Sequence, residues 1–193
     1  MMKWIPVVLA LFLVACSSDG KKTYYQLPTV STAASVAAVS AGGGLTPAAS
    51  QPKLWISQVN VADFLSTSGL VYQTSDVQYV MAANNLWASP LSQQLQQTLQ
   101  TYLGRNLPGW VISGQQANDG NQEQLSVNVT GFHGRYDGRA IVSGTWTLTR
   151  NGQVSQHNFN LELKQEADGY DALVRTLSQG WAQEANSIAS QIR

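Results

Sequence analysis

Hydrophobic residues recur at every second position in several stretches of the chain, which is the pattern of strands with one buried face. One stretch covers residues 53–61, and another, residues 69–82, folds back on itself around a polar turn. Three more follow one another through residues 124–164, separated by Asp-Gly at 137–138 and Asn-Gly at 151–152. Asn-Gly suits the two positive φ angles of a type I′ turn. The pattern therefore predicts a hairpin and, later in the chain, a three-stranded antiparallel meander.

Two other stretches space their hydrophobic residues at three and four positions, as amphipathic helices do. The first begins near Ser89, the expected N-cap, with Pro90 in the first helical position, and it ends near residue 106. The second begins near Asp168 and runs to Ile192. The order of elements predicts an α+β fold, a single domain whose mainly antiparallel sheet carries both helices on one face.

The N-terminus has the features of a secretory signal. A positive residue, Lys3, precedes twelve apolar residues at 4–15, too few to span a bilayer, which needs roughly 20. Leu13-Val14-Ala15-Cys16 matches the lipobox of bacterial lipoproteins, so we expect residues 1–15 to be removed and Cys16 to be lipidated. The alternative is an ordinary cleavage site that Cys16 merely adjoins.

The segment between this cysteine and the first long strand has two interpretations. Residues 16–22 are polar and form an acylated tether, and residues 29–52 are rich in Ser, Ala and Gly without any charge, which predicts a flexible low-complexity segment. Residues 23–28, Thr-Tyr-Tyr-Gln-Leu-Pro, belong either to the tether or to the folded body at 23–193. We favour the body, because paired tyrosines tend to be buried.

The composition offers little catalytic chemistry. The mature chain has ten Lys and Arg against eleven Asp and Glu, so nothing attracts nucleic acid, and a single cysteine excludes an internal disulfide. His133 and His157 lie in different predicted strands, and no carboxylate stands at metal-ligand spacing to either. We expect no metal, no cofactor and no enzyme activity. The alternative is a membrane-anchored periplasmic hydrolase that works through one of these histidines.

Candidate contacts with a partner lie at two places. Tyr136, displayed at a hairpin tip between Arg135 and Arg139, has the composition of an interface anchor, although it could also fold back over a solubilising turn. Trp87, just before the first helix, could face a partner or close the edge of the core.

Several stretches together resemble the ABC-type transport auxiliary lipoprotein family. They are the lipobox, Tyr-Tyr-Gln-Leu-Pro at 24–28, residues 71–95, residues 135–146 and the closing helix from residue 168. The resemblance covers nearly the whole chain. Cys16 is the functional residue that it carries over.

The resemblance implies a binding role without catalytic activity. It implies an outer-membrane lipoprotein, lipid-anchored on the periplasmic face, that docks or gates a periplasm-spanning tunnel for lipids at the outer membrane. The tunnel would be formed by an MCE-domain transport protein. Because that partner is a symmetric ring, a ring-shaped homo-oligomer of this chain would match it. The other class that stays open is a purely structural envelope lipoprotein.

Overall fold

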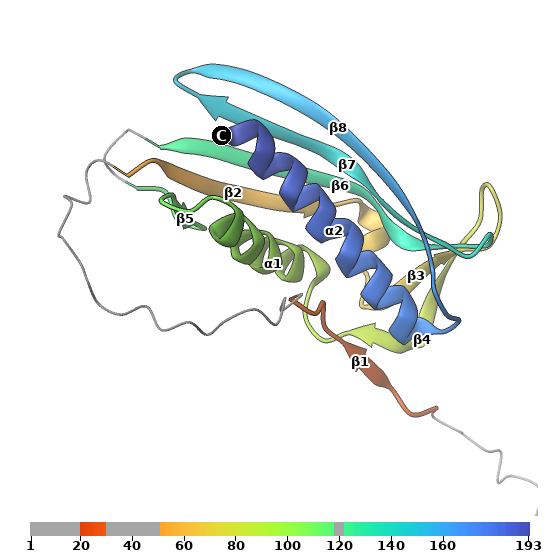
Figure 1. The fold of residues 1–193 in the computed structure, drawn as a ribbon. Coiled ribbons are helices and arrows are strands. Elements are labelled where there is room, and N and C mark those ends of the chain that lie inside the picture. Colours follow the sequence, from red (N-terminus) through yellow and green to blue (C-terminus); the bar gives the residue numbers. More distant parts are fainter. Residues whose placement is uncertain (1–19, 30–50, 118–121) are drawn as a thin grey trace, which may run out of the picture.

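The computed structural model describes residues 20–29, 51–117 and 122–193. The predicted signal peptide at 1–15, Cys16 and most of the low-complexity segment lie outside the described residues. The elements of the described part share one sheet and one helical layer (Figure 1). The strands are β1 (Thr23–Tyr25), β2 (Lys53–Val61), β3 (Gly69–Gln73), β4 (Tyr79–Trp87), β5 (Val111–Ser113), β6 (Glu123–Arg135), β7 (Arg139–Arg150) and β8 (Gln153–Lys164). The helices are the short 3₁₀ helix η3 (Asp63–Leu65), α1 (Leu91–Asn106) and α2 (Tyr170–Ile192).

The sheet is organised around β6. On one side β6 pairs with β7, which pairs with β8, and these two long ladders are antiparallel. On its other side β2 follows the first part of β6, and β3 pairs with its last two residues. The antiparallel hairpin β3–β4 and the predicted meander β6–β7–β8 are confirmed, and so is the mainly antiparallel α+β sheet. The parallel pairs β2–β6, β3–β6, β2–β5 and β1–β4 could not be foreseen from periodicity.

Both helices cover the same face of the sheet, as predicted (Figure 1). The core lies between the layers and is built from the alternate side chains of β2, β6 and β7 and from the apolar stripes of the helices. Its largest fully buried members are the two tryptophans Trp146 and Trp181. Trp181 donates its indole N–H to the Leu95 carbonyl across 3.1 Å, so one polar contact inside the core links α2 to α1. Neither α-helix of the described part has the length and apolar character that crossing a bilayer requires.

The ends of the elements show where local sequence signals were right and where they were not. Asn151 and Gly152 have φ angles of 51° and 77°, so the predicted tight turn between β7 and β8 is confirmed. The expected cap of the first helix was one residue early. The helix begins at Leu91, Pro90 occupies the N-cap position, and the Ser89 carbonyl accepts a hydrogen bond from the Gln94 side chain.

Residues 23–28 belong to the folded body, the alternative that the sequence favoured. β1 pairs in parallel with the end of β4, and the Tyr25 hydroxyl donates to the Asn85 side chain. Leu27 is 4% exposed, and its backbone N–H donates to the Gln94 side chain across 2.8 Å. The Pro28 carbonyl accepts a hydrogen bond from Ser178 on α2 at 2.7 Å. The folded body therefore includes β1, which starts at Thr23.

A β-bulge divides β6 into two parts, and odd-numbered residues face opposite sides of the sheet in the two parts. The register against β7 shifts between Val129 and Gly131, because two residues of β6 oppose one of β7 there. After the shift Phe132 faces the helical layer, where its ring lies 6.2 Å from that of Trp87. His133 consequently faces the other side of the sheet, where it is 4% exposed.

Candidate interaction site at one end of the sheet

The turn between β6 and β7 carries a closed network of charges. The Arg135 guanidinium donates to Asp137 at 2.7 Å and, with its other N–H groups, to Glu162 of β8 at 2.7 and 3.1 Å. Arg139 reaches the same two carboxylates, at 3.5 Å and 3.3 Å. Two cations and two anions thus neutralise one another at the end of the sheet. The arginines predicted as partner contacts are already engaged within the chain.

The network also sets the ionisation of its carboxyl groups. Hydrogen bonds from Arg135 hold the pKa of Asp137 and that of Glu162 below their ordinary values. The same bonds raise the pKa of Arg135. Arg135, Asp137 and Glu162 therefore stay charged at neutral pH, and the turn keeps its shape through fork-shaped guanidinium contacts.

Tyr136 projects from this braced turn. It is 56% exposed, whereas the arginine before it lies along the carboxylates. Of the two interpretations of the turn, the displayed tyrosine agrees with the structure. The charge network restricts the backbone that carries this exposed ring.

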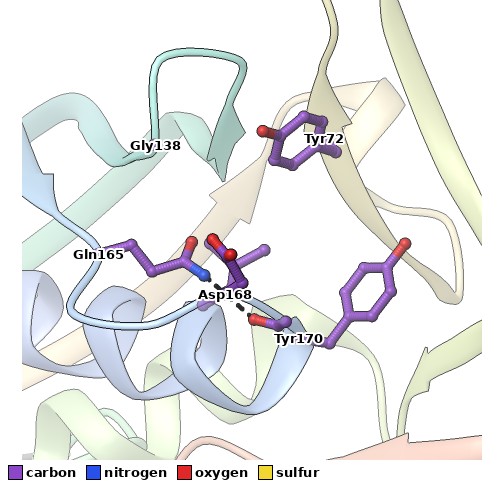
Figure 2. Close-up of a pocket in the computed structure, with 7 residues that line it drawn as sticks. Tyr72, Gly138, Gln165, Asp168 and Tyr170 are labelled. Atoms are coloured by element: carbon purple, nitrogen blue, oxygen red, sulfur yellow. Dashed lines mark hydrogen bonds between the residues drawn. The ribbon is translucent and has the colours of Figure 1, made fainter.

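A hollow of about 290 Å³ lies between this turn and the loop that leads from β8 into α2. Figure 2 shows the rings of Tyr72 and Tyr170 on one side of the hollow and the side chains of Gln165 and Asp168 on the other. The Gln165 side chain donates to the Gly169 carbonyl at 3.1 Å, and its backbone N–H donates to the Gly138 carbonyl at 2.9 Å. The first hydrogen bond shapes the loop between β8 and α2, and the second fastens this loop to the β6–β7 turn beside the hollow.

One glycine makes room for the tyrosine of this hollow. A Cβ at Gly134 would come within 2.6 Å of the Tyr72 ring and 3.2 Å of Leu173. Gly134 pairs directly with Tyr72 where β3 meets β6, and the edge of the ring occupies the space that a Cβ at residue 134 would need. The absence of a side chain at residue 134 therefore fixes where Tyr72 lies.

The other face of the sheet has an aromatic cluster at the same end. His133, Phe64 of η3 and Tyr79 of β4 form it, with the Tyr79 ring centroid 5.2 Å from His133 and 5.0 Å from Phe64. The His133 Nδ1 lies 3.0 Å from the Gly134 carbonyl, which identifies it as the N–H that donates there. Burial lowers the pKa of His133, against the opposing effect of this hydrogen bond. Neutral His133 thus braces the β3–β4 hairpin.

His157, the second histidine, lies elsewhere. It stacks on Trp146, its cross-strand partner, with ring centroids 4.2 Å apart, while the Trp146 indole donates to Glu184 of α2 at 2.9 Å. His133 pairs with Ile141, five positions from Trp146 along β7, so the two histidines lie on opposite faces of the sheet. They do not form one site. Among the described residues no group of three or more His, Cys, Asp or Glu side chains could hold a metal ion.

Trp87 lies in the core. It is 6% exposed and packs near Phe132, so the interpretation as a partner contact is wrong for the folded chain and the alternative, closure of the core edge, describes it. The β3–β4 hairpin exposes side chains that the alternating pattern at residues 69–82 predicted to share a buried face. Val77, Tyr79, Val80 and Met81 are each at least 40% exposed. Alternation indicates the strand, but it does not show that no other element among the described residues covers this part of it.

The sequence profile of the ABC-type transport auxiliary lipoprotein component matches residues 25–189. The chain belongs to this family. The match begins inside β1 and ends in the last turns of α2, so family membership applies to the whole folded body.

Relatives of this family member cover its full length. The chain is 49% identical over 194 residues to the intermembrane transport lipoprotein PqiC of Escherichia coli (strain K12), covering 100% of this chain and 98% of that protein. The PqiC protein of Shigella flexneri gives the same identity and coverage.

Solved structures share the fold. A crystal structure of an uncharacterized protein is 48% identical, covers 90% of this chain and 100% of its own, and superposes with a TM-score of 0.76. A structure from Xanthomonas campestris, 13% identical, covers 74% of this chain and 86% of its own with a TM-score of 0.60, and shows the same fold alone.

Proposed function

We propose that this chain is the outer-membrane lipoprotein of an intermembrane lipid transport system. Cys16 would carry acyl chains, and the folded body would dock or gate, on the periplasmic face, the end of a tunnel formed by an MCE-domain transport protein. The observation that carries the proposal is the end-to-end similarity to an intermembrane transport lipoprotein, 49% over the full chain. In this proposal the chain binds the tunnel protein and positions its end at the membrane, and the chain itself catalyses no reaction.

The attachment follows from the lipobox and from the docked N-terminal segment. Several acyl chains hold a protein on a membrane much more durably than one, at about 0.8 kcal/mol per buried methylene. Gly20, the first described residue, is four positions from Cys16, and four extended residues span at most about 14 Å. The tether therefore keeps the start of β1 beside the membrane. A partner that delivers lipid to this membrane has to approach the same place.

Tyr136 is the proposed contact with the tunnel protein. Its ring is exposed, and its turn is braced by the paired Arg135 and Arg139. Exposed aromatic residues on rigid supports lose little conformational entropy on binding, which is why they are enriched among energetically dominant contacts. A homo-oligomer would repeat this ring around a symmetric partner, and heterologous contacts between copies would close it.

The test uses the acylated full chain in phospholipid vesicles together with the purified MCE-domain protein. We expect co-sedimentation of the two, weakened about tenfold or more by Tyr136→Ala, the loss of one dominant aromatic contact. The matched control is Val154→Ala, a comparably exposed residue on the β7–β8 turn side, which should leave capture unchanged. Absence of capture with both proteins in membranes would contradict the docking role. Equal capture by the two variants would contradict the assignment of Tyr136.

A further inference from the structure

The β3–β4 hairpin exposes apolar side chains on both of its faces. Tyr79, Val80 and Met81 are consecutive, so they point alternately to opposite sides of the strand, and they are 40%, 48% and 46% exposed. Val77 in the turn is 78% exposed. Asp76 is the single charged residue between Gln73 and Met81. We call Val77, Tyr79, Val80 and Met81 the hairpin tip.

The hairpin tip is held in place rather than loose. Thr74 and Gln78 close the turn through a backbone hydrogen bond of 2.9 Å, and the Gln73 side chain donates to the Asp76 carbonyl at 3.3 Å. Tyr79 rests with one side on Phe64 and His133 while the rest of its ring is open. These hydrogen bonds and ring contacts thus hold the exposed hairpin tip in one position. Soluble proteins seldom expose such an apolar projection unless another surface covers it.

The described chain begins at the same end of the molecule as this projection (Figure 1). β1 runs parallel to residues 85–87 at the end of β4, so both strands enter their shared pairing from the same side. Gly20 lies against the Asn84 side chain, three residues from Met81. Figure 1 shows the start of β1, the β3–β4 turn and the β6–β7 turn at one end of the molecule, and the β7–β8 turn and the C-terminus at the other. With Cys16 at most about 14 Å from Gly20, the acyl chains enter the bilayer at the end that carries the hairpin tip.

We propose that the hairpin tip inserts into the surface of the bilayer that holds the acylated Cys16, as a second membrane contact of the folded body. This rests on the acylation proposed above. Tyrosine and aliphatic side chains are suited to the boundary between headgroups and acyl chains, where apolar groups of interfacial proteins lie about 5–10 Å deep. Lys21 and Lys22, both exposed, precede β1 and would face anionic headgroups at the same surface.

The experiment places a thiol-reactive fluorophore at Val77→Cys or, as control, at Val154→Cys on the β7–β8 turn side. Because the chain has one cysteine of its own, an acylated Cys16 leaves the introduced thiol as the single labelling site. The labelled full chain is reconstituted in vesicles of phosphatidylethanolamine with a minority of phosphatidylglycerol, with or without lipids that carry a quencher at the headgroup boundary. We expect the label at residue 77 to lose most of its emission to the quencher and the label at residue 154 to keep it.

A second variant tests the cause. Val80→Asp added to the residue 77 label should restore most of the emission, because a carboxylate on the hairpin tip opposes insertion, whereas Gln78→Asn in the same background should leave the quenching intact. Equal emission with and without quencher at residue 77, in a chain whose intact mass shows acyl groups and one label, overturns the insertion and leaves the anchor standing. Quenching that is replaced by energy transfer between copies, growing with protein density, assigns the tip to a second copy and also overturns it. An intact mass with two labels and no acyl group overturns the anchor and the insertion together.

Discussion

With the proposed anchor at Cys16, the docked segment 23–28 would determine how closely the body follows the membrane, and Leu27→Ala tests this directly. Leu27 is 4% exposed, and truncation of such a leucine costs about 2–5 kcal/mol. The segment is otherwise held by three residue pairs between β1 and β4, by side-chain hydrogen bonds to residues 25, 27 and 28, and by the contact of the Tyr25 ring with Tyr170. Because these contacts join one short segment to the rest of the fold, we expect it to open as a local unit.

The magnitude follows from local opening. If the segment opens without the rest of the fold, a loss of about 2 kcal/mol raises the open population about 30-fold. Opening also lengthens the connection to the membrane, since the next described strand begins at Lys53. Thirty-seven residues from Cys16 span up to roughly 120 Å when extended, against about 14 Å for the docked chain. The substitution would thus release the body from the membrane surface without unfolding it.

Amide hydrogen exchange measures this opening. The backbone N–H of residue 27 donates to Gln94 in the parent chain, so its exchange reports on the docked segment, and the amide of Val142 in β7 reports on the core. We expect exchange at residue 27 to accelerate about 30-fold or more while that at Val142 stays constant. Val154→Ala should change neither. Unchanged exchange at residue 27 would refute the reasoning, and equal acceleration at both positions would show that the segment opens only with the whole fold.

Three further substitutions or conditions test the site and the core. Burial raises the pKa of Glu184, so its ionisation destabilises the fold as the pH rises from its ordinary value of 4.5; Glu184→Gln should therefore increase the free energy of unfolding at pH 8 and have little effect at pH 4, as urea titrations would show. Asp137 and Glu162 have lowered pKa values, so their contribution to stability is complete above their ordinary values and is lost as acid protonates them in the folded chain. Exchange protection of the β6–β7 turn, taken relative to the intrinsic exchange rate at each pH, should therefore decrease as the pH falls below 3.8, the ordinary value of Asp137. Gly134→Ala should cost about 1–3 kcal/mol in thermal or urea unfolding, because its methyl group would displace Tyr72, and an unchanged stability would contradict that contact.

The spacing of hydrophobic residues predicted the helices and long strands well, because each of these elements buries one face. The alternating residues of β6, β7 and β8 face the helices, and the leucine stripe of α1 is buried as expected. Periodicity could not predict partners across long connections. The parallel pairing of β2 with β6 joins strands more than sixty residues apart, and neither strand carries a local signal for it.

The candidate site was predicted in part for the same reason. Local sequence indicated the Asp-Gly turn and placed Tyr136 at its tip, both of which are short-range features, but it left open whether the ring is displayed or folds back. Glu162, which neutralises the arginines, comes from the neighbouring strand, so only the register of β7 against β8 reveals it. Similarly, the bulge at Val129 turns His133 away from the helical layer, an effect that alternation before the bulge does not show.

The proposed membrane contact and the proposed partner contact are compatible because they occupy different projections of one end. The hairpin tip extends from β4, whereas Tyr136 stands on the β6–β7 turn, which its own charge network holds. A single flexible anchor would leave the body free to rotate about its tether. Two contacts with the bilayer, through the acyl chains and through the hairpin tip, would restrict that rotation. Tyr136 would then be presented at a fixed height and direction beside the membrane, where the end of a lipid tunnel must arrive. Loss of the hairpin contact should accordingly weaken capture of the tunnel protein through orientation alone, while loss of Tyr136 should weaken capture and leave insertion intact.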